Sequence, residues 1–394
     1  MRRLIFAIGL LIVQNCFANE WQFSKPIVVS QANKGVYQHL DASSRRAIAI
    51  SNKMVAVTWE DNSNGVPEIY VALKSISDQS FIRSFKVSET GPAYEPCIVG
   101  LNDGRFIIAW EADKRIWFRV ISETLKGNVS RVTKNDSRQV VLYVMPENNV
   151  IAAWAEKREK VYQIYYAKIK LNKASVNLTD AILVDKSKVK ADQAYPSLYQ
   201  SNKGTVVAWE DRRFGNTQIF TAFAKPGGKF SPHRVLNDFR PSRIARFGNG
   251  SGAMRVTISG NTATVLATWL DKRDFEGGYD VYAAMSEDGG ETFSDDELVQ
   301  DMFGENIPQW HNSGAVSHDN KMVSVWDDTR DEMSRLWFSE RVEGKWTEDI
   351  SLTENDEAKE THPVFAFDSK GQIHIAYIHR IKNSTRILYL MGHR

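Results

Sequence analysis

Residues 206–213, VVAWEDRR, and residues 218–222, QIFTA, form the clearest copy of a pattern that runs through the chain. Apolar and polar residues alternate with a period of two in both runs, which is typical of half-buried β-strands. The first run has its tryptophan at Trp209, a charged turn follows, and the second run carries an aromatic residue. The pattern predicts an antiparallel strand pair. Acid–arginine pairs such as Asp211 with Arg212 and Asp328 with Arg330 are expected to form salt bridges at these turns.

The pattern occurs seven times in the 394-residue chain. Its spacing ranges from 44 residues, between Trp110 and Trp154, to 60 residues, between Trp209 and Trp269. Four short strands can be marked in each copy, and no stripe of helical period exceeds two turns. Four antiparallel strands per repeat of this length are typical of a propeller blade, so the sequence predicts an all-β, seven-bladed β-propeller. The anchor residues of the seven copies are Trp59, Trp110, Trp154, Trp209, Trp269, Trp326 and Tyr377.

The two ends of the chain predict how the ring closes. A single strand-like run, Trp21 to Ser30, precedes the first copy, and the last copy stops after its third run at Leu390. We therefore expect the N-terminal strand to complete the C-terminal blade, which protects the sheet edges that an open array would expose. The predicted propeller domain covers residues 19–394.

The first 18 residues resemble an export signal. Arg2 and Arg3 precede the apolar stretch Leu4 to Val13, and Cys16-Phe17-Ala18 offers small residues for cleavage before Asn19. A lipoprotein anchored through Cys16 is the alternative, although the residues before it do not favour that processing. Cleavage leaves Cys97 as the single cysteine, so we expect no intramolecular disulfide and a secreted or periplasmic protein.

Composition and charge exclude several classes of protein. The chain is 42% hydrophobic and 25% charged, as folded globular proteins are. Arg2 and Arg3 account for the net charge of +2, so the mature chain is neutral and lacks the basic surface of a nucleic-acid binder. No later segment is apolar enough for a membrane helix, and the motifs GxSxG, HExxH, GxGxxG and the P-loop do not occur. We predict a monomer without cofactor or metal.

Function is expected where the copies differ from one another. In a four-stranded blade, the residue just before the innermost strand lies near a mouth of the central channel. The residues at this position share no chemistry that a common structural role would explain, and three further arginines fall within one residue of the same ring. The predicted ring consists of Arg45, Glu95, Gln139, Tyr195, Met254, His311 and His362, with Arg46, Arg138 and Arg255 beside it.

These residue types favour an anion-binding pocket. Guanidinium groups bind carboxylate, sulfate or phosphate in a flat, two-pronged geometry, whereas the alternative is a water-filled channel with solvated arginines. His311 and His362 could supply a general base, or two metal ligands with Gln139 or Glu95 as a third. The candidate catalytic residues are Tyr195, His311, His362 and Glu95. The predicted ligand-binding residues are Arg45, Arg46, Arg138, Arg255, Arg246 and Trp310.

Two long connections on the same face, residues 237–255 and 301–312, lead into copies five and six. They bring Arg246, Trp310 and other arginines and aromatic residues, which suit stacking on a sugar ring and holding an acidic group. We expect blades five and six to form the wall of a ligand site, with tolerated surface insertions as the alternative.

The segment Ser286 to Phe293, SEDGGETF, resembles the Asp-box hairpin of sialidase-type propellers, the BNR repeat. Weaker versions stand at the same place in copies four and six, GGKF at 227–230 and EGKW at 343–346. The resemblance implies a propeller fold. For a sialidase it also implies three arginines on the substrate carboxylate, a tyrosine nucleophile with a glutamate partner, and an aspartic acid as acid/base. Sialidases of that family have six blades and an Arg-Ile-Pro sequence before the first inner strand, whereas this chain has seven copies of its pattern and no Arg-Ile-Pro sequence there.

Two functions remain open at this point. The first is an exported binding module that holds an acidic glycan or a protein partner on its loop-rich face. The second is a carbohydrate-active enzyme on acidic glycans, either a sialidase-like glycosidase or a polysaccharide lyase. The resemblance to seven-bladed lyases implies a histidine or tyrosine that removes a proton beside a uronate neutralised by arginine.

Overall fold

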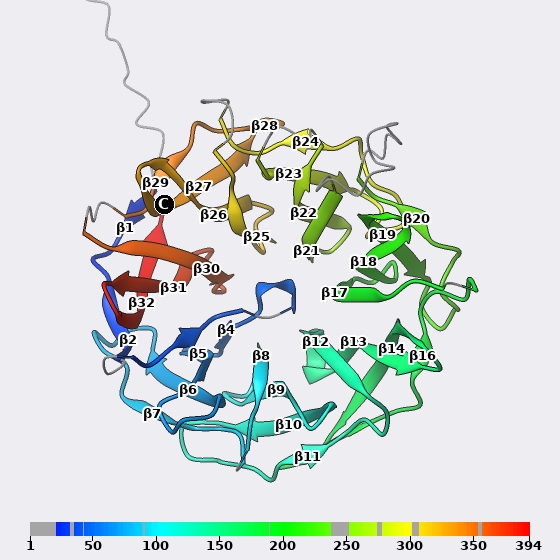
Figure 1. Cartoon of the computed structure of the whole chain (residues 1–394), viewed down its shortest axis with the longest axis horizontal. Coiled ribbons are helices and arrows are strands. Elements are labelled where there is room, and N and C mark those ends of the chain that lie inside the picture. Colours follow the sequence, from blue (N-terminus) through cyan, green and yellow to red (C-terminus); the bar gives the residue numbers. More distant parts are fainter. Residues whose placement is uncertain are drawn as a thin grey trace, which may run out of the picture.

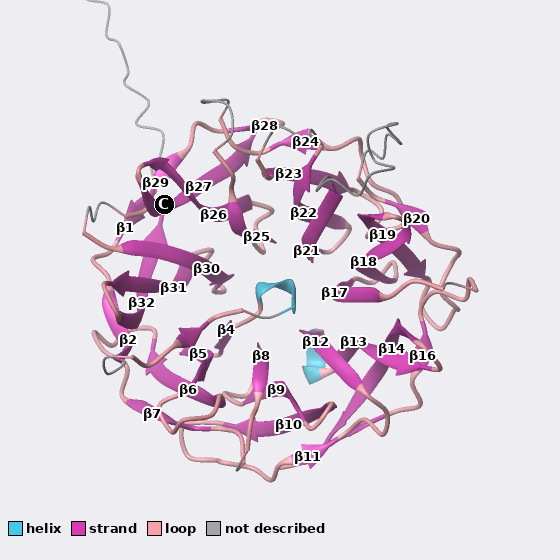
Figure 2. Cartoon of the chain, viewed as in Figure 1, coloured by secondary structure: helices cyan, strands magenta, loops and turns pink. Residues whose placement is uncertain are grey.

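The computed structural model describes residues 21–31, 35–41, 43–89, 91–188, 190–237, 252–273, 278–301, 307–353 and 357–394. These residues form seven antiparallel sheets arranged around a central axis (Figure 1). Within them, helix is confined to two 3-10 turns, η1 (Ser43–Arg45) and η2 (Pro146–Asn148) (Figure 2). The predicted seven-bladed, all-β propeller is confirmed. The proposed export signal, residues 1–18, lies outside the described residues.

The strands follow the chain from blade to blade. Blade 1 contains β3 (Gln38–His39), β4 (Ile48–Ser51), β5 (Met54–Asp61), β6 (Glu68–Ser75) and β7 (Arg83–Lys86). Blade 2 contains β8 (Tyr94–Gly100), β9 (Phe106–Ala112), β10 (Arg115–Ile121) and β11 (Ser130–Arg131). Blade 3 contains β12 (Ser137–Val144), β13 (Val150–Arg158), β14 (Val161–Leu171), β15 (Val176–Leu178) and β16 (Ile182–Leu183). Blade 4 contains β17 (Gln193–Gln200), β18 (Thr205–Phe214), β19 (Asn216–Ala224) and β20 (Arg234–Val235).

The last three blades repeat this order. Blade 5 contains β21 (Gly252–Asn261), β22 (Thr264–Lys272), β23 (Asp280–Ser286) and β24 (Glu297–Leu298). Blade 6 contains β25 (Trp310–Val316), β26 (Met322–Asp331), β27 (Met333–Val342), β28 (Lys345–Trp346) and β29 (Ile350–Ser351). Blade 7 contains β30 (Lys359–Phe367), β31 (Ile373–Ile381) and β32 (Ser384–His393), together with β1 (Gln22–Phe23) and β2 (Ile27–Gln31).

The ring closes as the sequence predicts. Both N-terminal strands, β1 and β2, pair antiparallel with β32, so the first described residues form the outer edge of the last blade. The indole of Trp21 also donates a hydrogen bond to Glu340 of blade 6 over 2.9 Å. Closure therefore joins the two ends of the chain through main-chain bonds rather than through a loop.

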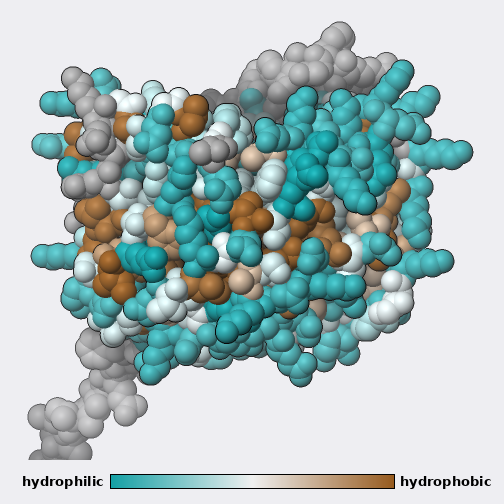
Figure 3. All heavy atoms as spheres, turned by 90° about the horizontal axis from the view of Figure 1, so that it is seen from below, coloured by the Kyte–Doolittle hydropathy of each residue, from teal (hydrophilic) through white to brown (hydrophobic). Residues whose placement is uncertain are grey.

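The anchor residues lie on the second strand of every blade and are almost completely buried. In five blades the indole N–H donates to the carboxylate two residues further along, as Trp209 does to Asp211 over 3.2 Å. Each buried indole contributes about 2 kcal/mol through burial, and its one polar atom is satisfied inside the core. Figure 3 shows one side of the disc, where hydrophilic side chains cover much of the rim around separate hydrophobic patches.

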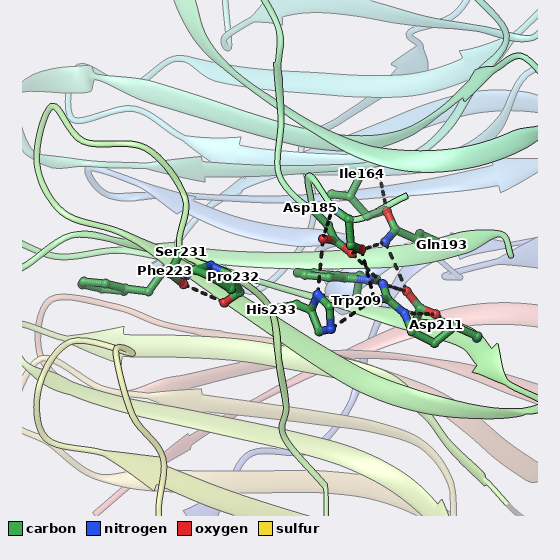
Figure 4. A network of polar contacts seen from close by, with 11 residues as sticks. Ile164, Asp185, Gln193, Trp209, Asp211, Phe223, Ser231, Pro232 and His233 are labelled. Carbon is green, nitrogen blue, oxygen red and sulfur yellow. Dashed lines mark hydrogen bonds and ion pairs between the residues drawn. The ribbon is translucent and has the colours of Figure 1, made fainter. Parts of the chain in front are cut away.

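A buried polar network joins blades 3 and 4 (Figure 4). The guanidinium of Arg213 bridges Asp185 and Asp211, at 2.5 and 2.6 Å, and the amide of Gln193 donates to the same two carboxylates. His233 lies beside Asp185 at 3.3 Å. The salt bridge predicted between Asp328 and Arg330 is confirmed, but Asp211 pairs with Arg213 rather than Arg212, because strand alternation turns these two arginines to opposite sides.

The Asp-box-like hairpin has the local structure that its sequence predicts. Asp288 accepts the backbone N–H and the hydroxyl of Thr292, at 2.9 and 2.6 Å, and Ser286 accepts the N–H of Gly290. Gly290 has a φ of 98°, which favours glycine, and Phe293 packs against the core. Cys97 is buried in the inner strand of blade 2, also as expected. No helix in the described ranges is long and apolar enough to cross a bilayer.

Blade 1 departs from the other blades in a way that the sequence did not reveal. Its inner strand is interrupted, because β3 and β4 both pair with β5 while residues 40–41 and 43–47 leave the sheet. The second of these stretches contains η1 and reaches the middle of the ring (Figure 2). The hydroxyl of Ser44 is hydrogen-bonded to that of Ser197 on the inner strand of blade 4, at 2.6 Å. We refer to residues 40–41 and 43–47 as the hub segment.

The network between blades 3 and 4 predicts which surface arginine matters for stability. Replacing Arg213 with Met leaves two buried carboxylates without their shared cation, so Arg213→Met should lower the free energy of unfolding by about 3 kcal/mol. Arg212, whose guanidinium bonds the hydroxyl of Thr217, is the matched control, and Arg212→Met should cost less than about 0.5 kcal/mol. Urea unfolding measures both, and equal losses would contradict the assignment.

Candidate functional site

The predicted hub residues share one backbone conformation. Arg45, Glu95, Gln139, Tyr195, Arg255, His311 and His362 all have φ between 46° and 58°. In blades 2 to 7 each lies where the pairing of the inner strand with its neighbour shifts register. A bulge of this kind redirects the side chain at the end of a strand. The ring position in blade 5 is therefore Arg255, one residue beyond the predicted Met254.

In blades 2, 3, 4, 5 and 7 the left-handed conformation is held by a side chain from the preceding blade. A residue outside glycine pays about 1 kcal/mol or more for it, whereas a hydrogen bond to a charged group contributes about 1.5 to 3 kcal/mol. The acceptors stand directly after the anchor tryptophans. Glu60 accepts the N–H of Glu95, Glu111 that of Gln139, Glu210 that of Arg255, and Asp327 that of His362. In blade 4 the amide oxygen of Gln139 accepts the N–H of Tyr195.

His311 and His362 are brought together in the hub. Their rings stack with centroids 3.6 Å apart, and Nδ1 of His311 lies 2.7 Å from Oδ1 of Asp327. The same oxygen accepts the backbone N–H of His362, so it acts as an acceptor and the imidazole of His311 donates from Nδ1. Burial and the charge of Arg45 lower the pKa of His311 to about 3, and burial and His311 lower that of His362 to about 3.

Two arginines meet at a carboxylate of the hub segment. Arg45 forms an ion pair with Asp41 at 2.7 Å, and Arg255 approaches the other oxygen of Asp41 at 3.6 Å. Although burial alone would raise it, Arg45 and Arg255 hold the pKa of Asp41 well below its usual range. The guanidinium of Arg255 also lies 3.8 Å from the centre of the Tyr195 ring. Its side chain is 24% exposed, against 4% for Arg45, so Arg255 is the more accessible cation.

Several acids of the hub have pKa values raised far above the usual range of a carboxyl group. Burial, reinforced by the charge of Asp41, raises the pKa of Glu95 to about 7. Burial and the charge of Glu95 raise the pKa of Glu111, and burial raises that of Glu210 to about 7. Oε2 of Glu95 is buried without a hydrogen-bond partner among the described residues. The hub therefore combines neutral imidazoles with carboxylic acids that titrate near neutral pH.

The other predicted arginines lie in different surroundings. Arg46 extends across the axis and donates to the carbonyls of Leu198 and Ile258, at 3.2 and 3.1 Å, away from the ring. The guanidinium of Arg138 packs on Tyr162 of its own blade, 3.6 Å from the ring centre, and its charge acts on Glu95 and Glu111 at the ring. Of the three arginines placed together by the sequence, Arg138 and Arg255 therefore both act on Glu95, whereas the hub segment carries Arg46 away from them and brings Arg45 to Asp41 beside Arg255.

Part of the predicted aromatic wall is described. Trp310 lies beside His311, with ring centroids 6.5 Å apart, and contacts Tyr279 at 5.3 Å. Arg246 lies outside the described residues, as do positions 238–251, 274–277 and 302–306 of the neighbouring connections. Within the described ranges, no group of three His, Cys, Asp or Glu side chains is placed to hold a metal ion.

Apart from Glu95, sequence reasoning missed the acids of this site. Asp41 follows no repeated pattern, so nothing in the sequence placed it in the hub. Glu60, Glu111, Glu210 and Asp327, by contrast, each directly follow an anchor tryptophan. The next residue binds the indole in three of these blades, and alternate strand residues face opposite sides. That alternation is the signal that could have distinguished these four hub acids from the acids that accept the indole N–H.

Comparison with known proteins identifies structures of the same fold but no sequence family. No protein-family model matches this sequence, and no curated protein does. An ulvan lyase of a new polysaccharide lyase family, bound to a glucuronate–rhamnose 3-sulfate ligand, is similar in structure with a TM-score of 0.60 at 10% identity, covering 91% of this chain and 95% of that one.

Two arabinan-degrading enzymes are similar over a smaller part of this chain. The α-L-arabinofuranosidase of Fusarium graminearum, in complex with an iminosugar inhibitor, has a TM-score of 0.52 at 10% identity and covers 75% of this chain and 91% of its own. The α-L-arabinanase of Penicillium chrysogenum, complexed with arabinobiose, has a TM-score of 0.52 at 12% identity and covers 75% and 92%. These similarities establish the shared propeller fold, and the three neighbours are carbohydrate-active enzymes.

The raised pKa of Glu95 predicts a pH-dependent stability. The folded chain holds the proton of Glu95 up to about pH 7, whereas an unfolded chain releases it near the ordinary glutamate pKa of 4.5. Ionised Glu95 therefore destabilises the fold increasingly as the pH rises from about 4.5 to 7. Glu95→Gln should raise the free energy of unfolding on the order of 2 kcal/mol at pH 8 and change it little at pH 4.

Urea unfolding at the two pH values measures this difference. The control is Glu287→Gln on the exposed Asp-box-like hairpin, which should alter stability little at either pH. A benefit of Glu95→Gln that does not grow with pH would contradict the placement of this carboxyl in the hub.

Proposed function

We propose that this chain is an exported polysaccharide lyase, a carbohydrate-active enzyme that cleaves an acidic polysaccharide. The proposed site is the ring mouth, the mouth of the central channel at which the ring residues such as Arg255 and His311 lie. The observation that carries the proposal is the His311–Asp327 pair. It supplies an oriented, neutral imidazole close enough to Arg45 and Arg255 for their charges to lower its pKa. The carbohydrate-active neighbours of the same fold support catalysis over a binding-only module. The predicted export signal fits a polymeric substrate met in the periplasm or outside the cell.

Arg255 is the proposed site for the uronate carboxylate. Arg255 is partly exposed and lies on the ring of Tyr195. Its distance to Asp41, 3.6 Å, is longer than the 2.7 Å between Arg45 and Asp41. A two-pronged contact from its guanidinium neutralises the carboxylate and so acidifies the adjacent C5–H of the sugar. Tyr195 acts as a positioning residue, because its ring supports the plane of the guanidinium. Trp310 provides an aromatic surface next to His311 on which a sugar ring can stack.

The proposed reaction is a β-elimination. Nε2 of His311 takes the proton from C5, the electron pair forms the C4–C5 double bond, and the C4–O bond to the neighbouring sugar breaks. Glu95, whose carboxyl keeps its proton to about pH 7, returns a proton to the leaving oxygen. An imidazole that is neutral and a carboxyl that is still protonated at the same pH are the base and the acid that this elimination needs. The bound carboxylate adds negative charge near His311, which raises the pKa of the imidazole once substrate is present.

A panel of uronate-containing and sialylated polymers tests the proposal. A lyase produces new reducing ends together with ultraviolet absorbance from the new double bond, whereas a glycosidase produces reducing ends or free sugar without that absorbance. We expect absorbance with at least one uronate polymer. Release of sialic acid would favour the sialidase-like alternative, and retention of intact polymers on a glycan array would favour the binding module.

Substitutions in the hub should separate binding from chemistry. His311→Asn removes the base and should lower kcat at least 1000-fold while changing KM little. Arg255→Met removes the contact to the carboxylate and should lower kcat/KM by a similar factor, in part through KM. His393→Gln and Arg131→Met, on exposed strand positions of blades 7 and 2, are the controls and should retain activity. Full activity of His311→Asn would exclude it as the base.

The pKa shifts also predict the pH profile. Because the pKa of His311 is lowered, its imidazole stays neutral well below pH 6, so kcat/KM should not fall near the usual histidine pKa of 6.5. Above about pH 7 it should decline, since Glu95 loses the proton that it donates and its negative charge repels the anionic sugar. In Glu95→Gln the alkaline limb attributable to this carboxyl should disappear. An acid limb centred at pH 6.5 would contradict the account.

A further inference from the structure

The second mouth of the central channel contains a separate cavity. Its walls come from the C-terminal ends of inner strands, such as Ile98–Gly100 of β8 and Phe365–Phe367 of β30. The ring residues stand at the N-terminal ends of the same strands, so the two mouths lie on opposite faces of the disc. The hub segment lies between them, and Ser44, Arg45 and Arg46 line the cavity from that side. Its volume is about 540 Å³.

Arg46 brings an uncompensated positive charge to this cavity. Its Nη2 donates to the carbonyls of Leu198 and Ile258, which leaves Nε and Nη1 without a partner of that kind. Cys97 and Tyr143, both ordinarily neutral, are the titratable groups that act on its charge from the elements packed around it. Over the part of the chain that the structure describes, no carboxylate forms an ion pair with Arg46. Arg46 is half-buried, and an anion that enters the cavity would supply the counter-ion that its guanidinium lacks among the described residues.

The cavity wall indicates what kind of anion suits the site. Ile48, Ile98, Ile258 and Phe365 contribute apolar surface, and the guanidinium of Arg46 lies 5.4 Å from the ring centre of Tyr143. His318 and Asp368 also line the cavity, and the carboxylate of Asp368 lies 3.5 Å from His374. Such a wall favours a ligand with an apolar body and one charged end, rather than a fully hydrated ion. A carboxylate matches the flat donor edge of an arginine.

We propose that this mouth is a second binding site, selective for a small organic carboxylate, with Arg46 as its anion-binding residue. The hub segment separates this site from His311 and Arg255, and Arg45 is the residue that borders both sites. Its ligand would bind on the face opposite to the polysaccharide. Arg46, which the sequence grouped with the ring arginines, belongs to this second site.

Calorimetric titration of the full-length mature chain with benzoate tests the site, and benzyl alcohol serves as the uncharged analogue. We expect benzoate to bind at one site and benzyl alcohol to bind at least tenfold more weakly. Arg46→Met should weaken benzoate binding at least tenfold, whereas Arg255→Met, at the other mouth, should leave it within twofold. Equal binding of the two compounds, or loss through Arg255→Met alone, would overturn the proposal.

A crystal soak keeps the test independent of whether Arg46→Met folds. Crystals of the unmodified chain soaked in 4-bromobenzoate should show an anomalous bromine peak in the cavity, with the carboxylate at Arg46. A peak at the ring mouth alone, or no peak at a concentration that saturates the calorimetric signal, would overturn the assignment. Activity on polysaccharide should be unchanged in Arg46→Met if that variant folds, so failure of the proposed function and failure of this site give different results.

Discussion

The hub depends on one kind of hydrogen bond. In it, the backbone N–H of a ring residue donates to the carboxylate that directly follows the anchor tryptophan of the preceding blade. It joins neighbouring blades in four places, through Glu60, Glu111, Glu210 and Asp327. It also stabilises the left-handed bulge that directs each ring side chain. One contact therefore serves both assembly of the ring and presentation of the side chains that we assign to function. In blade 4 the amide of Gln139 takes over this role for Tyr195.

This arrangement has an electrostatic consequence. The acids that hold the bulges are buried, which raises the pKa of Glu111 and Glu210, and the charge of Glu95 raises the pKa of Glu111 further. Burial together with His311 and Arg45 lowers the pKa of His362. Asp41 is the exception, because it sits between Arg45 and Arg255. A hub with few net charges, one accessible guanidinium and an oriented imidazole suits chemistry on a carboxylate-bearing sugar. The structural bonds of the ring and the proposed catalytic tuning thus have a common origin.

Much of the fold and part of the site followed from the sequence. The period of the tryptophan pattern gave seven blades, and the unmatched run at Trp21 to Ser30 gave the closure. The ring position was correct in six copies and shifted by one in copy five, because a bulge adds a residue that period-two counting does not register. The hub segment escaped prediction, since its residues leave the sheet and follow no repeat. Arg46 and Arg255 both fall within one residue of the predicted ring position, but they face different mouths of the channel because Arg46 belongs to the hub segment.

The most direct test of the central claim is a crystal structure of the inactive His311→Asn variant with a uronate oligosaccharide of a polymer that the unmodified chain degrades. The account predicts the sugar carboxylate within about 3 Å of the Arg255 guanidinium, with C5 directed at position 311 and the glycosidic oxygen toward Glu95. An oligosaccharide bound on the rim, at the opposite mouth, or with its carboxylate away from Arg255 would contradict it.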